Sequence, residues 1–310
     1  MSLVAVIGGG GFIGSHVVDH LAAAGHRVRV VDPAPRWRNP AAHYLVADLF
    51  DDEALDAALD GCAAVFHLAG ASDVNQVAAD PVAAVRLNVE GTARVLAAAA
   101  RQQCGRVLLA STVWVYGATV GEDERGTERM EDAPVDLARA GHVYISTKLA
   151  AELLMHSYRQ MYGQHFTILR YGIPYGPRMR ENLVLARFVR AALDGRPITI
   201  AGTGEQQRNY VYVEDLAQAH VRALVPGAAD QVLALEGDTS VSVREIADTV
   251  TALIAPVPVV HGPARLADYE GVSVSNRRAK EVLGWSPHTS FAVGVRRYVD
   301  WLSEQDGDQP

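Results

Sequence analysis

The sequence has few cysteines, no excess of basic residues and no long apolar run. Its two cysteines, Cys62 and Cys104, offer neither a disulfide framework nor metal-ligand spacing, so we expect no metal site and a reducing, cytoplasmic location. Acidic residues outnumber basic ones by 36 to 28, which argues against nucleic acid or an anionic membrane as a partner. No apolar run approaches the roughly 18 residues of a membrane span, and we expect no signal peptide because the first apolar stretch lacks a basic leader.

Short β-branched runs alternate with helical patterns in the first half of the 310-residue chain. We expect strands at residues 3–7, 27–31, 63–67, 106–110 and 167–170. We expect helices at residues 12–24, 51–59, 81–101 and about 142–162. This alternation predicts an α/β fold with a doubly wound parallel sheet.

The pattern changes after residue 170, where proline, glycine and arginine concentrate. Ser242 and Glu245 have the spacing of a capping box at the start of a helix at 243–253. Further helices are expected at 182–193, 213–224, about 276–283 and 291–303. We therefore expect a smaller C-terminal α/β lobe set against the sheet.

A glycine-rich run at residues 8–14 joins the first expected strand to the first expected helix. It satisfies two spacings at once, Gly8-x-x-Gly11-x-x-Gly14 and Gly9-x-Gly11-x-x-Gly14. Glycines let the backbone turn tightly and approach a pyrophosphate, whose charge then faces the helix N-terminus. Between a strand and a helix this run predicts a dinucleotide site, and a plain strand–helix turn is the alternative.

Asp32 closes the second expected strand. A carboxylate at this place accepts hydrogen bonds from the adenosine ribose and repels a 2′-phosphate, which favours NAD over NADP. Arg36 and Arg38 would reverse this preference if they folded back toward the site. Asp48 and Leu49 fall where the adenine edge is expected, and the same segment could also cap the following helix.

Tyr144 and Lys148 lie four residues apart in an expected helix, so the phenol and the ammonium share one face. At ~4 Å and an effective dielectric constant of about 20, their attraction is on the order of 4 kcal/mol. This equals roughly three pKa units, enough to bring a tyrosine from about 10 toward neutrality. Such a tyrosine is a general base for an alcohol proton. Taken alone, however, this spacing is more often an exposed helix pair.

Ser111 and Thr112 follow the expected strand at 106–110. The carboxyl ends of strands are where an open α/β sheet places its ligands. A hydroxyl group there can bind a substrate oxygen while Tyr144 takes the proton. An ordinary Ser/Thr turn is the alternative.

Together these motifs resemble the extended short-chain dehydrogenase/reductase superfamily, and within it the NAD-dependent nucleotide-sugar epimerase/dehydratase family. The matches span nearly the whole chain. In the first half they include His67-Leu68-Ala69-Gly70, Asn88-Val89-Glu90-Gly91-Thr92 and Val115-Tyr116-Gly117. In the second half they include Arg170-Tyr171, Tyr175-Gly176-Pro177, Asn182-Leu183, the run from Gly202 to Arg208, and Leu283-Gly284-Trp285-Ser286-Pro287.

The resemblance implies a Rossmann domain formed by residues 1–172 and about 208–236, and a nucleotide-sugar-binding lobe formed by about 173–207 and 237–310. It implies NAD as cofactor, a nucleotide-diphosphate sugar as substrate and a homodimer. The catalytic residues would be Thr112, Tyr144 and Lys148. NAD would be held by Gly8, Gly11, Phe12, Ile13, Gly14, Asp32, Asp48, Leu49, Leu68, Ala69, Gly70, Asn88, Tyr144, Lys148 and Tyr171. The substrate would be held by Thr112, Trp114, Asn182, Leu183, Arg208 and Arg265.

Arginine suits a diphosphate because its planar guanidinium matches two phosphate oxygens at once. The resemblance therefore implies that Arg208 and Arg265, with Asn182, hold the nucleotide diphosphate. Arg208 could instead form a surface ion pair, which would contribute little.

Three departures from the family pattern bear on the activity. Ile173 stands where many relatives have asparagine, so one polar substrate contact is missing. Val113 and Trp114 stand where dehydratase and decarboxylating relatives place an acidic residue, and apolar side chains cannot transfer protons. Residues 275–278, Ser-Asn-Arg-Arg, replace the usual Asp-x-Ser-Lys pattern and leave recognition of the base open.

We therefore expect an NAD-dependent nucleotide-diphosphate-sugar epimerase that acts at C4 through a transient 4-keto intermediate. A dehydratase or a 4-ketoreductase of the same family is the alternative. A dinucleotide-binding sensor without catalysis is a third hypothesis, which the presence of Thr112, Tyr144 and Lys148 disfavours. No nucleic-acid or membrane partner is expected.

Overall fold

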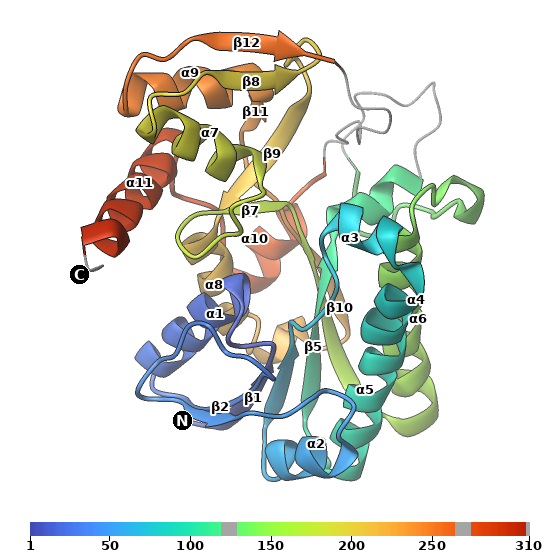
Figure 1. Ribbon diagram of the computed structural model, residues 1–310. Helices are drawn as coiled ribbons and strands as arrows, with labels where there is room; N and C mark the ends of the chain where they lie inside the picture. Colours follow the sequence, from blue (N-terminus) through green and yellow to red (C-terminus); the bar gives the residue numbers. More distant parts are fainter. Residues whose placement is uncertain (119–128, 264–273, 308–310) are drawn as a thin grey trace.

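A seven-stranded parallel sheet forms the larger part of the computed structural model, which describes residues 1–118, 129–263 and 274–307 (Figure 1). Its strands are β1 (Leu3–Ile7), β2 (Arg27–Val31), β3 (His43–Leu45), β4 (Ala64–His67), β5 (Arg106–Thr112), β6 (His165–Tyr171) and β10 (Gln231–Leu235). The strand order is β10-β6-β5-β4-β1-β2-β3, and every neighbouring pair is parallel. The expected doubly wound α/β fold is thus confirmed.

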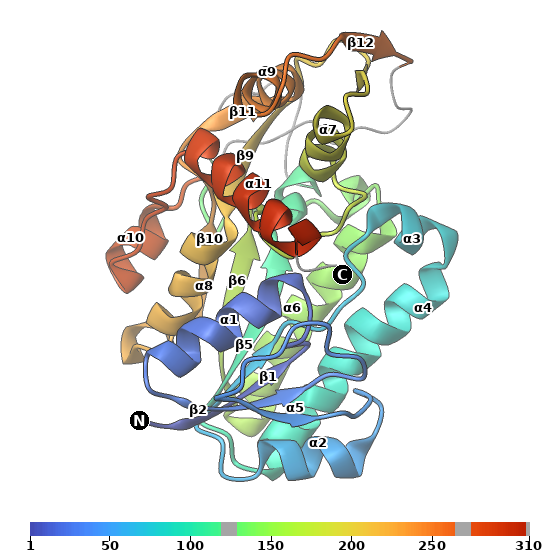
Figure 2. The same cartoon turned by 60° about the vertical axis from the view of Figure 1, so that its left-hand side comes forward.

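Helices cover both faces of the sheet, which is why its strands are almost continuously apolar. In β1, Val4 and Val6 point to one face, and Ala5 and Ile7 to the other. The first face packs against α1 (Phe12–Ala23), α8 (Val213–Arg222) and α10 (Arg277–Leu283), and the second against α2 (Asp52–Leu59), α5 (Gly91–Arg101) and α6 (Val143–Tyr162). Figure 2 shows these two helical layers on either side of the strands.

The helix expected at residues 81–101 is divided. It consists of α4 (Pro81–Val85), a π-helical turn (Arg86–Glu90) and α5. A further helix, α3 (Val74–Ala79), precedes it and was not predicted. Asp73 and Asp80 accept hydrogen bonds from backbone N–H groups at the starts of α3 and α4, so each short helix has its own N-cap.

The smaller lobe contains two small sheets. One has the order β11 (Ser240–Ser242), β9 (Gln207–Tyr212), β7 (Ile173–Tyr175), and the other pairs β12 (Val259–Gly262) with β8 (Ile198–Ala201). They pack against α7 (Val184–Leu193), α9 (Val243–Leu253) and α11 (Phe291–Gly307). The predicted capping box is confirmed, because the Ser242 hydroxyl accepts from the Glu245 N–H and the Glu245 carboxylate from the Ser242 N–H. The chain returns from this lobe to the large sheet through α8 and β10 (Figure 1).

Both cysteines are buried as free thiols. Burial raises the pKa of the Cys104 thiol to about 12, so this group stays protonated at neutral pH. Within residues 1–118, 129–263 and 274–307, no helix has both the length and the apolar character required to cross a bilayer.

Candidate active site

A cavity of about 1100 Å³ lies at the carboxyl ends of the strands and is lined by residues of both lobes. This volume exceeds the roughly 300–1,000 Å³ typical of a pocket for one small molecule. Eighteen of the residues implied to bind NAD or substrate line it: Gly8, Gly11, Phe12, Ile13, Gly14, Asp32, Asp48, Leu49, Leu68, Ala69, Gly70, Thr112, Trp114, Tyr144, Lys148, Tyr171, Leu183 and Arg208.

The glycine turn has the shape that a pyrophosphate requires. Gly8 adopts a φ of 81°, and a Cβ on Gly14 would lie 2.1 Å from the Gly8 carbonyl oxygen. Gly11 is the N-cap of α1 and provides no side-chain cap, and the first turn of α1 carries no acidic residue. The helix N-terminus therefore presents backbone N–H groups and a positive dipole end to an anion at the cavity wall.

The Asp32 carboxylate is fixed beside this turn. It accepts hydrogen bonds from the N–H groups of Gly10 at 3.0 Å and Ala34 at 2.9 Å. Of the two nearby arginines, Arg36 lines the cavity, whereas Arg38 lies over the Tyr44 ring at 5.1 Å. The carboxylate therefore stands at the cavity wall in the place expected to select NAD.

The segment around Asp48 was expected either to line the adenine site or to cap the following helix, and Asp48 and Asp51 each take one of these two places. Asp51 is the N-cap of α2, where its carboxylate accepts from the Ala54 N–H at 3.0 Å. Asp48 is exposed and lines the cavity together with Leu49. The cap and the cavity wall are thus formed by different residues of one short turn.

Thr112 and Tyr144 both line the cavity. Thr112 is the last residue of β5 and pairs in register with Tyr171 on β6, while Tyr144 lies in the first turn of α6. The Thr112 side chain is close enough to the Tyr144 phenol to favour its ionised form and lower its pKa, against the larger effect of burial. Trp114 stands edge-on to the phenol ring, with 6.2 Å between ring centroids. The side chains expected to orient a substrate hydroxyl and to take its proton are therefore adjacent.

Burial opposes the ionisation of both Tyr144 and Lys148, and the attraction expected between them remains a prediction from their spacing. Burial raises the pKa of Tyr144 to about 12 and lowers the pKa of Lys148 to about 8. The helix face that carries both side chains is buried rather than exposed, and desolvation is the largest influence on the pKa of each group.

A buried ionic network joins Ser111, the residue before Thr112, to α6 and β6. The Glu152 carboxylate accepts from the Arg170 guanidinium at 2.7 and 3.0 Å and from the Ser111 hydroxyl at 2.5 Å. Arg170 also donates to the Tyr116 hydroxyl at 2.8 Å. Ser111 therefore supports the end of β5, and the hydroxyl offered to Tyr144 is that of Thr112.

Three residues implied to bind ligands are not part of the described cavity wall. Asn88 is buried and contacts α6, where its amide donates to the Thr147 hydroxyl at 3.0 Å. Asn182 donates to the Asp73 carboxylate at 2.6 Å. Arg265 lies outside the described residues.

Arg36, one of the two arginines considered beside Asp32, does line the cavity, and three further cavity arginines were not named as candidates from the sequence: Arg178, Arg180 and Arg187. The last three come from the segment after β7 and from α7. Their only sequence signal was the concentration of proline, glycine and arginine after residue 170. Their arrival at the cavity depends on how the smaller lobe is placed over the sheet.

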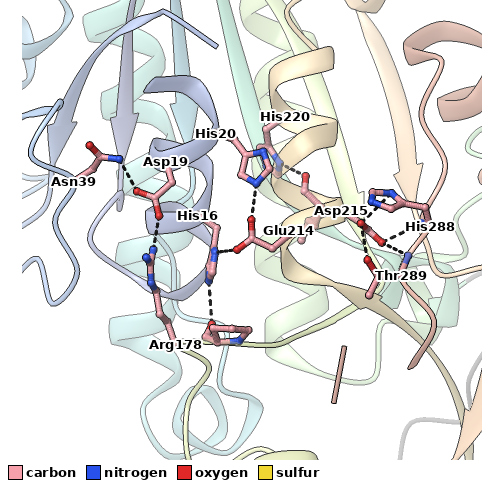
Figure 3. A network of polar contacts seen from close by, with 12 residues as sticks. His16, Asp19, His20, Asn39, Arg178, Glu214, Asp215, His220, His288 and Thr289 are labelled. Carbon is pink, nitrogen blue, oxygen red and sulfur yellow. Dashed lines mark hydrogen bonds and ion pairs between the residues drawn. The ribbon is translucent and has the colours of Figure 1, made fainter. Parts of the chain in front are cut away.

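A polar network connects the segment between β7 and α7 to helix α1 of the large sheet domain (Figure 3). The two carboxylate oxygens of Glu214 on α8 contact His16 at 2.6 Å and His20 at 2.5 Å, both on α1. The other ring nitrogen of His16 lies 3.0 Å from the Pro177 carbonyl oxygen. The start of α1 is therefore held between α8 and the chain that leads to the cavity arginines.

A parallel sheet whose cavity is lined by both a glycine turn and a threonine–tyrosine–lysine group defines a dinucleotide-dependent enzyme of the α/β class. The model of the NAD dependent epimerase/dehydratase family matches residues 4–233. The chain belongs to this family, and NAD is the family's cofactor.

Relatives in this family differ in the reaction that they are named for. The chain is 33% identical over 311 residues to the UDP-glucose 4-epimerase of Mycolicibacterium smegmatis, covering 96% of this chain and 97% of that protein. It is 27% identical over 320 residues to the UDP-N-acetyl-alpha-D-glucosaminuronate decarboxylase of Bacillus cytotoxicus, covering 98% of each. The solved structure of MoeE5 in complex with UDP-glucuronic acid and NAD is similar with a TM-score of 0.87 and 31% identity, over 97% of this chain and 99% of that one.

Proposed function

We propose that the protein is an NAD-dependent nucleotide-diphosphate-sugar 4-epimerase. The observation that carries the proposal is that Thr112, Tyr144 and the glycine turn line one cavity, in which the Thr112 side chain acts on the Tyr144 phenol. The arrangement suits the removal of a proton from a sugar hydroxyl beside a bound dinucleotide. The similarity to a UDP-glucose 4-epimerase over 96% of the chain supports this reaction.

The glycine turn, Asp32 and Lys148 are the groups that would hold the cofactor. When bound, NAD would supply hydride transfer from and back to the sugar carbon. Tyr144 removes the proton of the C4 hydroxyl, and Thr112 orients that oxygen by a hydrogen bond. The 4-keto sugar then turns within the cavity. Reduction from its other face and return of the proton from Tyr144 complete the inversion, so no cofactor is consumed overall.

The nucleotide diphosphate is assigned to the smaller lobe. Arg208 on β9 and Leu183 before α7 line the cavity on this side, and Arg265 is retained in the proposal from the family resemblance. Guanidinium groups pair with phosphate oxygens in bidentate fashion. In this proposal residues 1–172 and about 208–236 bind NAD, and about 173–207 with 237–310 bind the nucleotide sugar.

We also propose a homodimer formed through the helices that flank the large sheet. Large apolar side chains are exposed on α4 and α6, among them Val82 at 77%, Leu153 at 62% and Met161 at 70%. A second copy of the chain would cover them. Sedimentation velocity of the purified protein measures the oligomeric state directly.

The residues that follow Thr112 support dehydration and decarboxylation less well than they support epimerisation. The positions after Thr112 are Val113, which is buried, and Trp114, which contacts the ring of Tyr144. Neither side chain transfers a proton, so elimination would need a base from elsewhere. The relative named as a decarboxylase keeps this alternative open to test.

The test is incubation of the purified protein with UDP-glucose, UDP-glucuronate and their N-acetylated analogues without added NAD. NMR of the products should show the C4 epimer. Incorporation of solvent deuterium at C5 would indicate dehydration, release of carbon dioxide would indicate decarboxylation, and net consumption of NADH would indicate a ketoreductase. Inertness toward all UDP-, dTDP- and GDP-sugars would contradict the proposal.

A further inference from the structure

The loop between β2 and β3 forms the cavity wall beside Asp32. Its residues Arg36 and Trp37 line the cavity, and their backbone N–H groups donate to the Gly10 carbonyl oxygen at 3.2 and 3.4 Å. The loop lies directly against the glycine turn, because a Cβ on Gly10 would be 2.3 Å from the Cα of Pro35. A movement of this loop therefore changes the cavity beside the turn at which the cofactor pyrophosphate is expected.

Trp37 also contacts the smaller lobe, through helix α11. Its indole ring stands edge-on to that of Trp301, with 5.6 Å between ring centroids and 67° between ring planes. Trp301 is stacked in turn on Tyr298 at 6.0 Å, and Tyr298 is buried in the apolar core of the smaller lobe. Figures 1 and 2 show α11 running from that lobe toward the large sheet domain. The loop is thus in contact with a side chain that the core of the other lobe holds in place.

A second set of contacts involves the same loop. The Arg178 guanidinium, from the segment after β7, lies over the Trp37 ring with 5.7 Å to its centroid. It donates to one carboxylate oxygen of Asp19 on α1 at 2.7 Å, and the other oxygen accepts from the Asn39 amide of the loop at 2.7 Å (Figure 3). Contacts from α1, from α11 and from the segment after β7 therefore meet at one cavity-lining loop.

Trp301 acts on the cavity only through this loop. It is not among the described residues that line the cavity, so its influence on a bound dinucleotide passes through Trp37. Surface loops are ordinarily the more mobile parts of a fold. A loop that is already ordered does not have to be ordered by the ligand, which tightens binding. Among variants of one complex such differences appear mainly in the dissociation rate, so release of the dinucleotide is the step that this contact should slow.

We propose that Trp301 is a positioning residue for the cofactor, which holds Trp37 and the β2–β3 loop against the glycine turn and so slows the release of NAD. The inference goes beyond the proposed function, because NAD is the cofactor of the family whichever sugar reaction is catalysed. Slow release suits the proposed epimerisation, since that reaction consumes no cofactor and requires no exchange of NAD between cycles.

The test is the rate at which radiolabelled NAD leaves the loaded protein after excess unlabelled NAD is added. An aromatic pair contributes enough to change a rate constant by about two- to tenfold, and Trp301→Ala should speed release by that factor. Trp301→Leu, which keeps an apolar side chain in the lobe, should also speed release. Trp301→Phe keeps a ring at the contact and should restore most of the slow release. Val293→Ala, at an exposed position of the same helix, is the control and should leave the rate unchanged.

A double-mutant cycle separates this role from a general loosening of the smaller lobe. Because Trp301 acts through Trp37, Trp301→Ala should change the release rate by less than about twofold in the Trp37→Ala background. A larger acceleration there would show that Trp301 stabilises the lobe alone. A change of less than about twofold in the parent background would show that the contact does not retain NAD. Either result would overturn the inference, and neither depends on the sugar reaction, because no sugar is present.

Discussion

The carboxylate of Glu152 and the guanidinium of Arg170 are joined by two hydrogen bonds, of 2.7 and 3.0 Å, with both side chains less than a tenth exposed. The pair connects α6 to β6, and Glu152 also accepts from Ser111, the residue before Thr112. Glu152 lies one helical turn from Lys148, and its charge acts to raise the pKa of that lysine against the stronger effect of burial. This ion pair therefore holds α6 against β6, and its carboxylate also favours the charged form of Lys148.

Loss of one partner of this pair should be strongly destabilising. In Glu152→Ala the Arg170 charge remains buried without its counter-ion, and we expect a loss of about 3–5 kcal/mol in the free energy of unfolding. Urea denaturation measures it. Glu90→Ala removes an exposed carboxylate that also pairs with an arginine, and it should cost less than about 1 kcal/mol. Equal effects of the two substitutions would contradict the importance of burial.

Removal of the Tyr144 hydroxyl should abolish catalysis and spare the fold. Tyr144→Phe takes away the proton acceptor, and we expect kcat to fall by about 10² to 10⁴-fold. The NAD dissociation constant, measured by calorimetry, should change little because the ring still fills its place. Tyr162→Phe, in an exposed residue of the same helix, is the matched control and should retain full activity. A Tyr144→Phe variant as active as the parent would show that another group is the base.

A methyl group on Gly14 should open the glycine turn. The added Cβ would meet the Gly8 carbonyl oxygen at 2.1 Å, so the backbone must shift. We expect Gly14→Ala to weaken NAD binding by at least about tenfold and to cost about 1–3 kcal/mol of stability. In the control, Gly227→Ala, the new Cβ meets no atom within 4 Å, and both quantities should stay close to the parent's. Unchanged NAD affinity in Gly14→Ala would contradict a pyrophosphate site at this turn.

Acid should weaken the contact between α1 and α8. Burial acts to raise the pKa of Glu214, but hydrogen bonds and charges from His16 and His20 hold it well below its usual 4.5. A depressed carboxyl pKa adds stability above the unfolded-state value, and this stability is lost as the pH falls through the folded-state value. Glu214→Gln should therefore be less stable than the parent at pH 6, and the difference should shrink below about pH 4.5.

Urea midpoints measured from pH 3 to pH 7 test this dependence. Glu304→Gln, at an exposed position of α11, serves as the control and should follow the parent at every pH. A stability difference for Glu214→Gln that stayed constant across the range would mean that the carboxylate contributes packing alone.

Local sequence was sufficient to predict most elements of the sheet domain, because each has a residue pattern that packing against its neighbours reinforces. The apolar runs at 3–7 and 27–31 became β1 and β2 with the expected bounds, since strands covered on both faces need uninterrupted apolar residues. The short strands β7, β8, β11 and β12 were not predicted. Each has three or four residues and is defined by a partner distant in sequence, so no periodicity could reveal it.

The sequence by itself determined the family, the parallel sheet, the glycine turn and the residues Thr112, Tyr144 and Lys148, because these depend on spacing within single elements and their neighbours. Only the tertiary structure decided the surroundings of Tyr144 and Lys148. Desolvation depends on everything packed around a group, and here it opposes the ionisation of both side chains. Arg180 reaches the same cavity from the segment after β7, where its guanidinium lies 3.7 Å from the Asp73 carboxylate. Contacts between distant segments have no sequence period, and they become visible only when the two lobes are seen together.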